Sequence, residues 1–179
     1  MKQHVLLLAS LVAWGPIALS QEGARYPLVA VEDGDTITVQ VEGEIKRLQL
    51  AGIDAPEDLV NPKLTRDQGR TGLSSETLLA LGNAATTHLK QLLSPGDEVQ
   101  VVGDLTNSDR YGRIPVFAYK DKHSLNAAMV ADGYAIVLQQ SSIAQEIKTE
   151  LSALQLSAQG EKRGLWGSHN SETTRWSGL

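Results

Sequence analysis

Residues 28–53 contain three short segments in which apolar and polar side chains alternate or β-branched side chains dominate. The segments cover residues 28–32, 36–41 and 45–53, and turn-forming residues separate them at Asp33-Gly34 and at positions 41–44. Period-two segments joined by tight turns predict consecutive antiparallel strands. The ordered part of the chain should therefore begin with a three-stranded meander.

The rest of the chain adds helices and a second group of strands. Leucine and alanine recur at helical spacing over residues 75–93, and Ser94-Pro95-Gly96 should end that helix. Two further strands are expected at residues 98–102 and 114–119, followed by a short helix beginning near Ser124. Residues 134–138 are compatible with an extended backbone conformation. A capping box at residues 142–145 predicts the start of a final helix.

These elements predict an α+β fold: a five-stranded Greek-key β-barrel of the oligonucleotide-binding (OB) type, with about three helices. Residues 57–75 are rich in turn-forming and polar side chains and show no period, so we interpret them as a long surface loop. The domain should cover residues 27–168, and residues 169–179 should form a flexible tail.

The first twenty residues have the composition of a secretory signal peptide. Lys2 precedes an apolar run at residues 5–14, and Ala18-Leu19-Ser20 supplies small residues for cleavage. We therefore expect residues 1–20 to be removed and the mature protein to be secreted or periplasmic, with no membrane association. No later apolar stretch is long enough to span a bilayer.

Three short polar clusters, at residues 33–36, 53–57 and 109–113, carry carboxylates and guanidinium groups. Converging carboxylates without Cys or His nearby suit Ca²⁺ or Mg²⁺. An arginine beside such a cation suggests a bound phosphate. A metal, a free carboxylate and an arginine are the parts that phosphodiester hydrolysis requires, so the pattern predicts a metal-dependent nuclease.

Composition limits how such a protein could hold its substrate. The net charge is −5, and broad electrostatic capture of a polyanion is therefore excluded. A nucleic acid would have to be held by local arginines and the metal. The four histidines, at positions 4, 88, 123 and 169, lack zinc-ligand spacing, and no phosphate-cradling glycine-rich loop with lysine is present.

In their order and spacing, the three clusters resemble those of the staphylococcal nuclease (thermonuclease) family over roughly residues 27–168. The resemblance implies one Ca²⁺ ion, with Mg²⁺ less favoured, and DNA and/or RNA as substrate. It implies that Asp35 and Asp54 are carboxylate ligands of the ion and that the Ala55 backbone carbonyl is a third ligand. Glu57 matches the carboxylate that orients or deprotonates the attacking water. We expect a monomer.

The arginines match the family less completely. Arg113 matches one of two arginines that grip the scissile phosphate, and Arg110 stands where the family often has a basic residue. The second phosphate-gripping arginine should stand five residues before Asp54, but that position is Gln49. Arg47 lies two residues earlier on the same strand face, about 6.6 Å away. Two hypotheses follow: an active nuclease, or a catalytically weakened module that binds nucleic acid or another polyanion.

Overall fold

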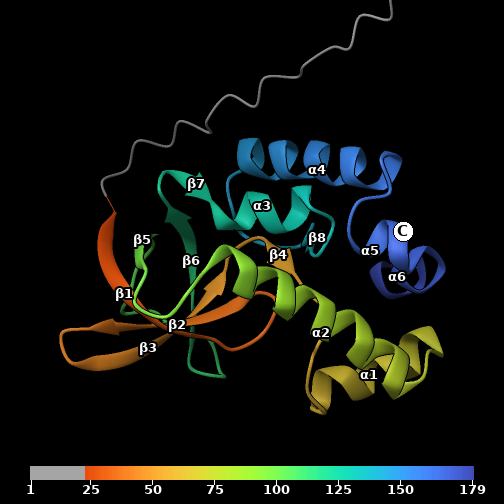
Figure 1. Cartoon of the computed structure of the whole chain (residues 1–179), viewed down its shortest axis with the longest axis horizontal. Coiled ribbons are helices and arrows are strands. Elements are labelled where there is room, and N and C mark those ends of the chain that lie inside the picture. The colour runs from red at the N-terminus through yellow and green to blue at the C-terminus, as the bar shows by residue number, and fades with distance from the viewer. Residues whose placement is uncertain (1–22) are drawn as a thin grey trace, which may run out of the picture.

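The computed structural model describes residues 23–179 (Figure 1). The predicted signal peptide, residues 1–20, lies outside the described residues. Among the described helices, none combines the length and apolar character needed to cross a bilayer.

Five strands form a closed barrel, as the sequence predicts. The barrel strands are β1 (Ala24–Val31), β2 (Thr36–Val41), β3 (Glu44–Leu50), β5 (Glu98–Val102) and β6 (Arg113–Lys120). Three shorter strands lie outside it: β4 (Ile53–Asp54), β7 (His123–Ser124) and β8 (Ile136–Val137). The α+β barrel architecture is therefore confirmed.

The pairing of β3 with β6 closes the barrel. Antiparallel pairs give the order β3-β2-β1-β5-β6, and β3 then joins β6 in parallel. Register is fixed by alternation, because Leu48 and Leu50 of β3 point inward while Arg47 and Gln49 lie on the outer face. The expected long third strand divides at Ala51-Gly52 into β3 and β4, which allows Asp54 to leave the barrel and pair with Ile136 of β8.

More of the chain is helical than expected. The helices are α1 (Pro62–Thr71), α2 (Ser75–Leu92), α3 (Leu125–Ala131), α4 (Gln145–Gly160), α5 (Leu165–Ser168) and α6 (Asn170–Ser177). The prediction of a loop over residues 57–75 was wrong, because α1 occupies its centre. The expected capping box is also absent: α4 begins at Gln145 with no side-chain cap.

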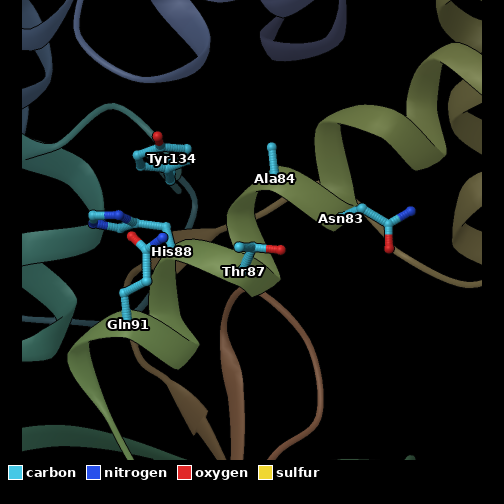
Figure 2. A pocket seen from close by; sticks show the side chains of 6 residues that line it. All are labelled: Asn83, Ala84, Thr87, His88, Gln91 and Tyr134. Carbon is cyan, nitrogen blue, oxygen red and sulfur yellow. The ribbon is translucent and has the colours of Figure 1, made fainter.

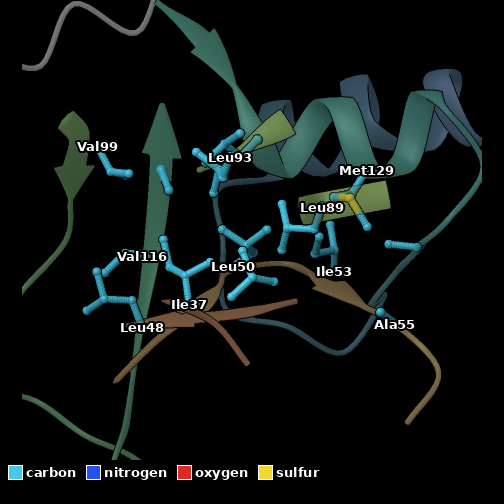
Figure 3. Packing of buried hydrophobic residues seen from close by; sticks show 14 of the residues in the cluster. Ile37, Leu48, Leu50, Ile53, Ala55, Leu89, Leu93, Val99, Val116 and Met129 are labelled. Carbon is cyan, nitrogen blue, oxygen red and sulfur yellow. The ribbon is translucent and has the colours of Figure 1, made fainter. Parts of the chain in front are cut away.

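The main core fills the barrel and continues to the helices above it (Figure 3). Ile37, Leu48 and Leu50 from the strands are fully buried, as are Leu89 of α2 and Met129 of α3. Figure 3 shows these side chains in one continuous cluster beside Ile53 and Ala55. The segment that carries Asp54 is thus anchored on both sides by core residues.

A second, smaller core joins α1, α2 and the C-terminal helices. Leu64 of α1, Leu78 and Leu81 of α2, Leu165 of α5 and Trp176 of α6 are buried together. The expectation of a flexible tail at residues 169–179 therefore fails for α6, where Trp176 is only 2% exposed. Burial of the apolar surface of Trp176 stabilises the packing of α6 against α1.

Candidate functional site

Asp35 and Asp54, far apart in sequence, are adjacent in the fold. The turn after β1 places Asp35 at the start of β2, where Oδ2 accepts a hydrogen bond of 3.0 Å from the Ala55 backbone N–H. Oδ1 accepts a second from the Thr36 hydroxyl. Asp35 is 5% exposed, and the charge of Asp54 lies close enough to repel its carboxylate. The fold thus brings together the two carboxylates that the sequence assigned to a cation.

Burial makes this acidic cluster costly to ionise in the metal-free protein. Burial, together with the charge of Asp35, raises the pKa of Asp33 to about 7. Burial and the charge of Asp54 raise the pKa of Asp35 to about 6. Burial also raises the pKa of Asp54, although Lys63 opposes the shift. A bound cation would remove this cost, since opposite charge favours the ionised form.

These shifts predict that, in the presence of a chelator, the stability of the protein decreases as pH rises. A carboxyl whose pKa is raised by folding stabilises the native state at low pH, and that stabilisation is lost as pH rises through the folded value. The free energy of unfolding in urea should therefore fall from about pH 4 to about pH 7, the interval between the ordinary carboxyl pKa of 3.8 and the folded value of Asp33. Asp33→Asn, which retains an acceptor for the Asp35 N–H, should reduce this slope by on the order of 1 kcal/mol per pH unit. An unchanged slope would contradict the burial argument.

Glu57 is held by two residues that flank the start of α1. Asn61, the N-cap of α1, donates its side-chain amide to Oε2, and Lys63 forms an ion pair with Oε1 at 2.8 Å. Asn61 also accepts hydrogen bonds from the backbone N–H groups of Lys63 and Leu64, so the helix start and the Glu57 carboxylate are fixed together. Both oxygens of Glu57 are engaged.

The backbone of Glu57 passes directly against α2 at Gly82. A Cβ at this position would lie 2.1 Å from the Glu57 carbonyl oxygen and 2.6 Å from the Asp58 nitrogen. Only glycine permits this approach. The position of the Glu57 side chain thus depends on a helical glycine that the sequence analysis did not identify.

Substitution of Gly82 tests this dependence. Gly82→Ala should lower the free energy of unfolding by about 1–3 kcal/mol, because the clash exceeds the gain in helix propensity. Gly69→Ala in α1, where the new Cβ meets nothing within 4 Å, should instead stabilise by about 0.5–1 kcal/mol. Urea unfolding of both variants measures the difference. Equal stabilisation by the two substitutions would show that the Glu57 segment moves freely.

The arginines lie on the outer face of the barrel, where β3 and β6 run in parallel. Arg47 is directly paired with Arg113, and Gln49 is paired with Pro115. On its other side β3 pairs Arg47 with Thr38 and Gln49 with Thr36. Gln49 is therefore the β3 residue beside the start of β2, where Asp35 lies, and Arg47 is one step farther along.

Both arginines have carboxylate partners. The Arg47 guanidinium binds Glu32 through Nε and Nη2, donates from Nη1 to the Tyr111 carbonyl, and is also attracted to Asp33 and Asp109. Hydrogen bonding to Glu32 helps raise the pKa of Arg47 above its usual value. Arg113 forms a two-point contact with Asp109, at 3.1 Å from Nε and 2.9 Å from Nη2. A phosphate would have to share or replace these partners.

Tyr111, in the loop before β6, contacts the guanidinium groups of Arg110 and Arg113. The Arg110 guanidinium carbon lies 4.8 Å from the centre of the Tyr111 ring, and that of Arg113 lies 5.4 Å away. Tyr111 is half exposed, so its ring is available on the surface. Cation–π contacts of this kind orient the guanidinium groups.

The chemistry of the cluster suits a hard cation. Asp54, Glu57 and the Ala55 carbonyl already surround one positive charge, the ammonium of Lys63. Within residues 23–179, no group of three His, Cys, Asp or Glu side chains is arranged to hold a metal by itself. Asp35, Asp54 and Ala55 remain the residues that would hold the ion. Sequence reasoning missed Lys63, because it lies in the segment interpreted as a loop.

A shallow hollow on another side of α2 is separate from this cluster. It is lined by Asn83, Ala84, Thr87, His88, Gln91 and Tyr134 (Figure 2). The His88 ring stacks on Tyr134 with ring centres 4.1 Å apart, and its Nε2 contacts Asp132 at 2.8 Å. None of the predicted site residues lines this hollow, so its contacts are best explained as packing of α2 against the segment after α3.

Comparisons with known proteins agree with the fold. The family described as staphylococcal nuclease homologue matches residues 47–168. The chain is 30% identical over 167 residues to an uncharacterized endonuclease of Escherichia coli, covering 93% of this chain and 90% of that protein. It is 28% identical over 110 residues to the thermonuclease of Staphylococcus hyicus, covering 62% of this chain and 57% of that protein.

A third relative is much longer than this chain. Endonuclease YhcR of Bacillus subtilis strain 168 is 29% identical over 160 residues, which cover 87% of this chain and 12% of the Bacillus protein. The chain therefore spans about an eighth of that relative. Since the family match extends from β3 through α5 and includes Asp54, Glu57 and Arg113, the chain belongs to the staphylococcal nuclease homologue family.

Proposed function

We propose that this protein is a metal-dependent phosphodiesterase that hydrolyses DNA and/or RNA. The observation that carries the proposal is that Asp54, Glu57 and the Ala55 carbonyl surround one positive charge, while Asp35 is hydrogen-bonded to the Ala55 N–H beside them. Arginines stand on the neighbouring strands of the same barrel. The relatives named endonuclease and thermonuclease support the same activity.

Each residue has a role that its position supports. Asp35, Asp54 and Ala55 would hold one Ca²⁺ ion, with Mg²⁺ less favoured because it demands stricter octahedral geometry. When bound, the ion would supply charge stabilisation and activation of water. Glu57 would orient that water and accept its proton. Arg113 and Arg47 would bind the phosphate oxygens and stabilise charge that develops on them.

Digestion assays on the mature chain test the proposal. Single- and double-stranded DNA and RNA are incubated with Ca²⁺, with Mg²⁺ and with chelator. We expect cleavage with Ca²⁺, much less with Mg²⁺, and none with chelator. Cleavage that persists in chelator would contradict metal dependence. Binding of the nucleic acids without cleavage in any condition would instead favour a weakened binding module.

The weakened module is favoured by one observation, the presence of Gln49 where a second arginine is expected. An amide donates hydrogen bonds to a phosphate but brings no charge. Loss of one preorganised charged donor costs about 10²–10³ in rate. Arg47 is the alternative donor, one step along β3 and directly beside Arg113.

Restoring the arginine separates these possibilities. Gln49→Arg should raise the rate of DNA cleavage about tenfold or more, since the new guanidinium stands beside Thr36 and the acidic cluster. Arg47→Ala should lower the rate in the wild-type background, and should have a smaller effect when combined with Gln49→Arg. Rates are measured on a fluorescent oligonucleotide. If Gln49→Arg has no effect while Arg47→Ala abolishes cleavage, Arg47 already acts as the second arginine.

We also propose that the mature protein is secreted or periplasmic and acts as a monomer. The sequence of residues 1–20 supports export. Expression of the full-length chain followed by N-terminal sequencing of exported protein should give a start at Gln21. Retention of Met1 on exported or cell-associated protein would contradict cleavage. Light scattering of the mature form measures the oligomeric state.

A further inference from the structure

The ammonium group of Lys63 lies among the oxygens that we assign to the divalent ion and to the attacking water. Its Nζ is 3.1 Å from Asp54 Oδ1, 3.0 Å from the Ala55 carbonyl oxygen and 2.8 Å from Glu57 Oε1. Repulsion between Asp54 and Glu57 would otherwise be uncompensated, because these groups are largely removed from water. Lys63 therefore acts as their counter-ion in the metal-free protein.

Helix α1 fixes the place from which Lys63 reaches the cluster. Asn61 caps the helix, and Leu64, adjacent to Lys63, is 1% exposed in the second core. Asp67 on the next turn accepts a hydrogen bond from the Trp176 indole N–H. The base of the Lys63 side chain is thus rigid. The side chain itself is 27% exposed, and a lysine stem has four rotatable bonds, so rotation about them would carry the ammonium into solvent without movement of α1.

We propose that Lys63 is a tethered cation that competes with the divalent ion for the oxygens of Asp54 and Ala55, so that the ion binds only when the Lys63 side chain swings out. This inference rests on the proposed function. The same movement releases Oε1 of Glu57, because one ammonium holds both carboxylates. Metal binding and the freeing of the catalytic carboxylate are thereby coupled, and the coupling lowers the affinity for metal.

Calcium titration calorimetry on the mature protein tests the competition. Lys63→Met removes the ammonium and keeps most of the apolar stem, and Lys63→Gln is a second neutral variant. The control is Arg66→Met, which removes the same charge from an exposed position of the same helix. We expect both Lys63 variants to bind Ca²⁺ about 10- to 100-fold more tightly than the wild type. Arg66→Met should bind like the wild type.

Thermal unfolding supplies a readout that does not depend on activity. In chelator, the Lys63 variants should unfold at lower temperature than the wild type, because the carboxylates lose their counter-ion. Excess Ca²⁺ should raise their unfolding temperature by more than it raises that of the wild type or of Arg66→Met. Circular dichroism at low temperature establishes that each variant is folded.

The possible failures are distinguishable. Equal or weaker Ca²⁺ binding by Lys63→Met, with binding by the wild type intact, would overturn the competition and leave the proposed function standing. Absence of Ca²⁺ binding in the wild type and in all variants would overturn both. Cleavage by the wild type in chelator that Lys63→Met abolishes would also overturn the inference, since Lys63 would then replace the metal permanently.

Discussion

Glu57→Gln is expected to reduce the rate of nucleic-acid cleavage by about 10²–10⁴ while leaving the fold intact. The substitution keeps the size of the side chain and an oxygen that can accept the hydrogen bond from Asn61. It removes the ability to take a proton from water. It also removes one of the two negative charges that Lys63 contacts. Initial rates at saturating Ca²⁺ on a labelled oligonucleotide measure the effect.

A matched control is available on α4. Glu150 is an exposed glutamate in the middle of that helix, so Glu150→Gln makes the same chemical change away from the cluster. Its cleavage rate should equal that of the wild type. Nucleic-acid binding by Glu57→Gln should persist, because the arginines of β3 and β6 are untouched. A Glu57→Gln variant that cuts within about threefold of the wild-type rate would exclude Glu57 as the group that activates water.

Trp176→Ala is expected to lower the free energy of unfolding by about 3–5 kcal/mol. The Trp176 side chain is 2% exposed and packs with Leu64, Leu78 and Leu81 in the second core. Its indole N–H also donates to Asp67 of α1 at 3.3 Å. The substitution leaves a cavity between α6 and α1 and an acceptor without its donor. Urea unfolding followed by circular dichroism measures the change.

Two further variants separate the contributions. Trp176→Phe retains most of the apolar surface and loses the indole donor, so it should cost about 1–2 kcal/mol. Leu156→Ala on α4, where the side chain is 67% exposed, should change stability by less than about 0.5 kcal/mol. A loss below about 1 kcal/mol for Trp176→Ala would mean that residues 169–179 behave in solution as the flexible tail predicted from sequence.

Elements with strong local periodicity were predictable. The alternation of residues 36–41 predicts that Ile37 and Val39 of β2 face the core, where both are fully buried, and the leucine spacing of residues 75–93 gives α2 nearly to its ends. Helix α1 was missed because its interior is polar and holds Gly69, so it shows little apolar period. It is specified instead by the Asn61 cap, Pro62 at the first helical position, and a few side chains such as Leu64.

Some residues of the candidate site were likewise predictable from the sequence, and one was not. Asp35, Asp54 and Glu57 were named from motif spacing, and the fold places Asp35 against Ala55 and both Asp54 and Glu57 against one ammonium. Lys63 carried no such pattern. Lys63 becomes important only because α1 folds back over the turn that follows β4. No local pattern in residues 57–75 predicts that contact.

By itself, the sequence determined the strands, the acidic clusters and their order along the chain, because turn residues and side-chain alternation act over a few neighbouring positions. Only the tertiary structure decided that Arg47 stands beside Arg113, that Lys63 reaches Asp54 and Glu57, and that Trp176 closes a second core. These long-range contacts join residues up to 109 positions apart, as with Asp67 and Trp176. Their formation depends on barrel closure and on the burial of apolar surface across the whole chain.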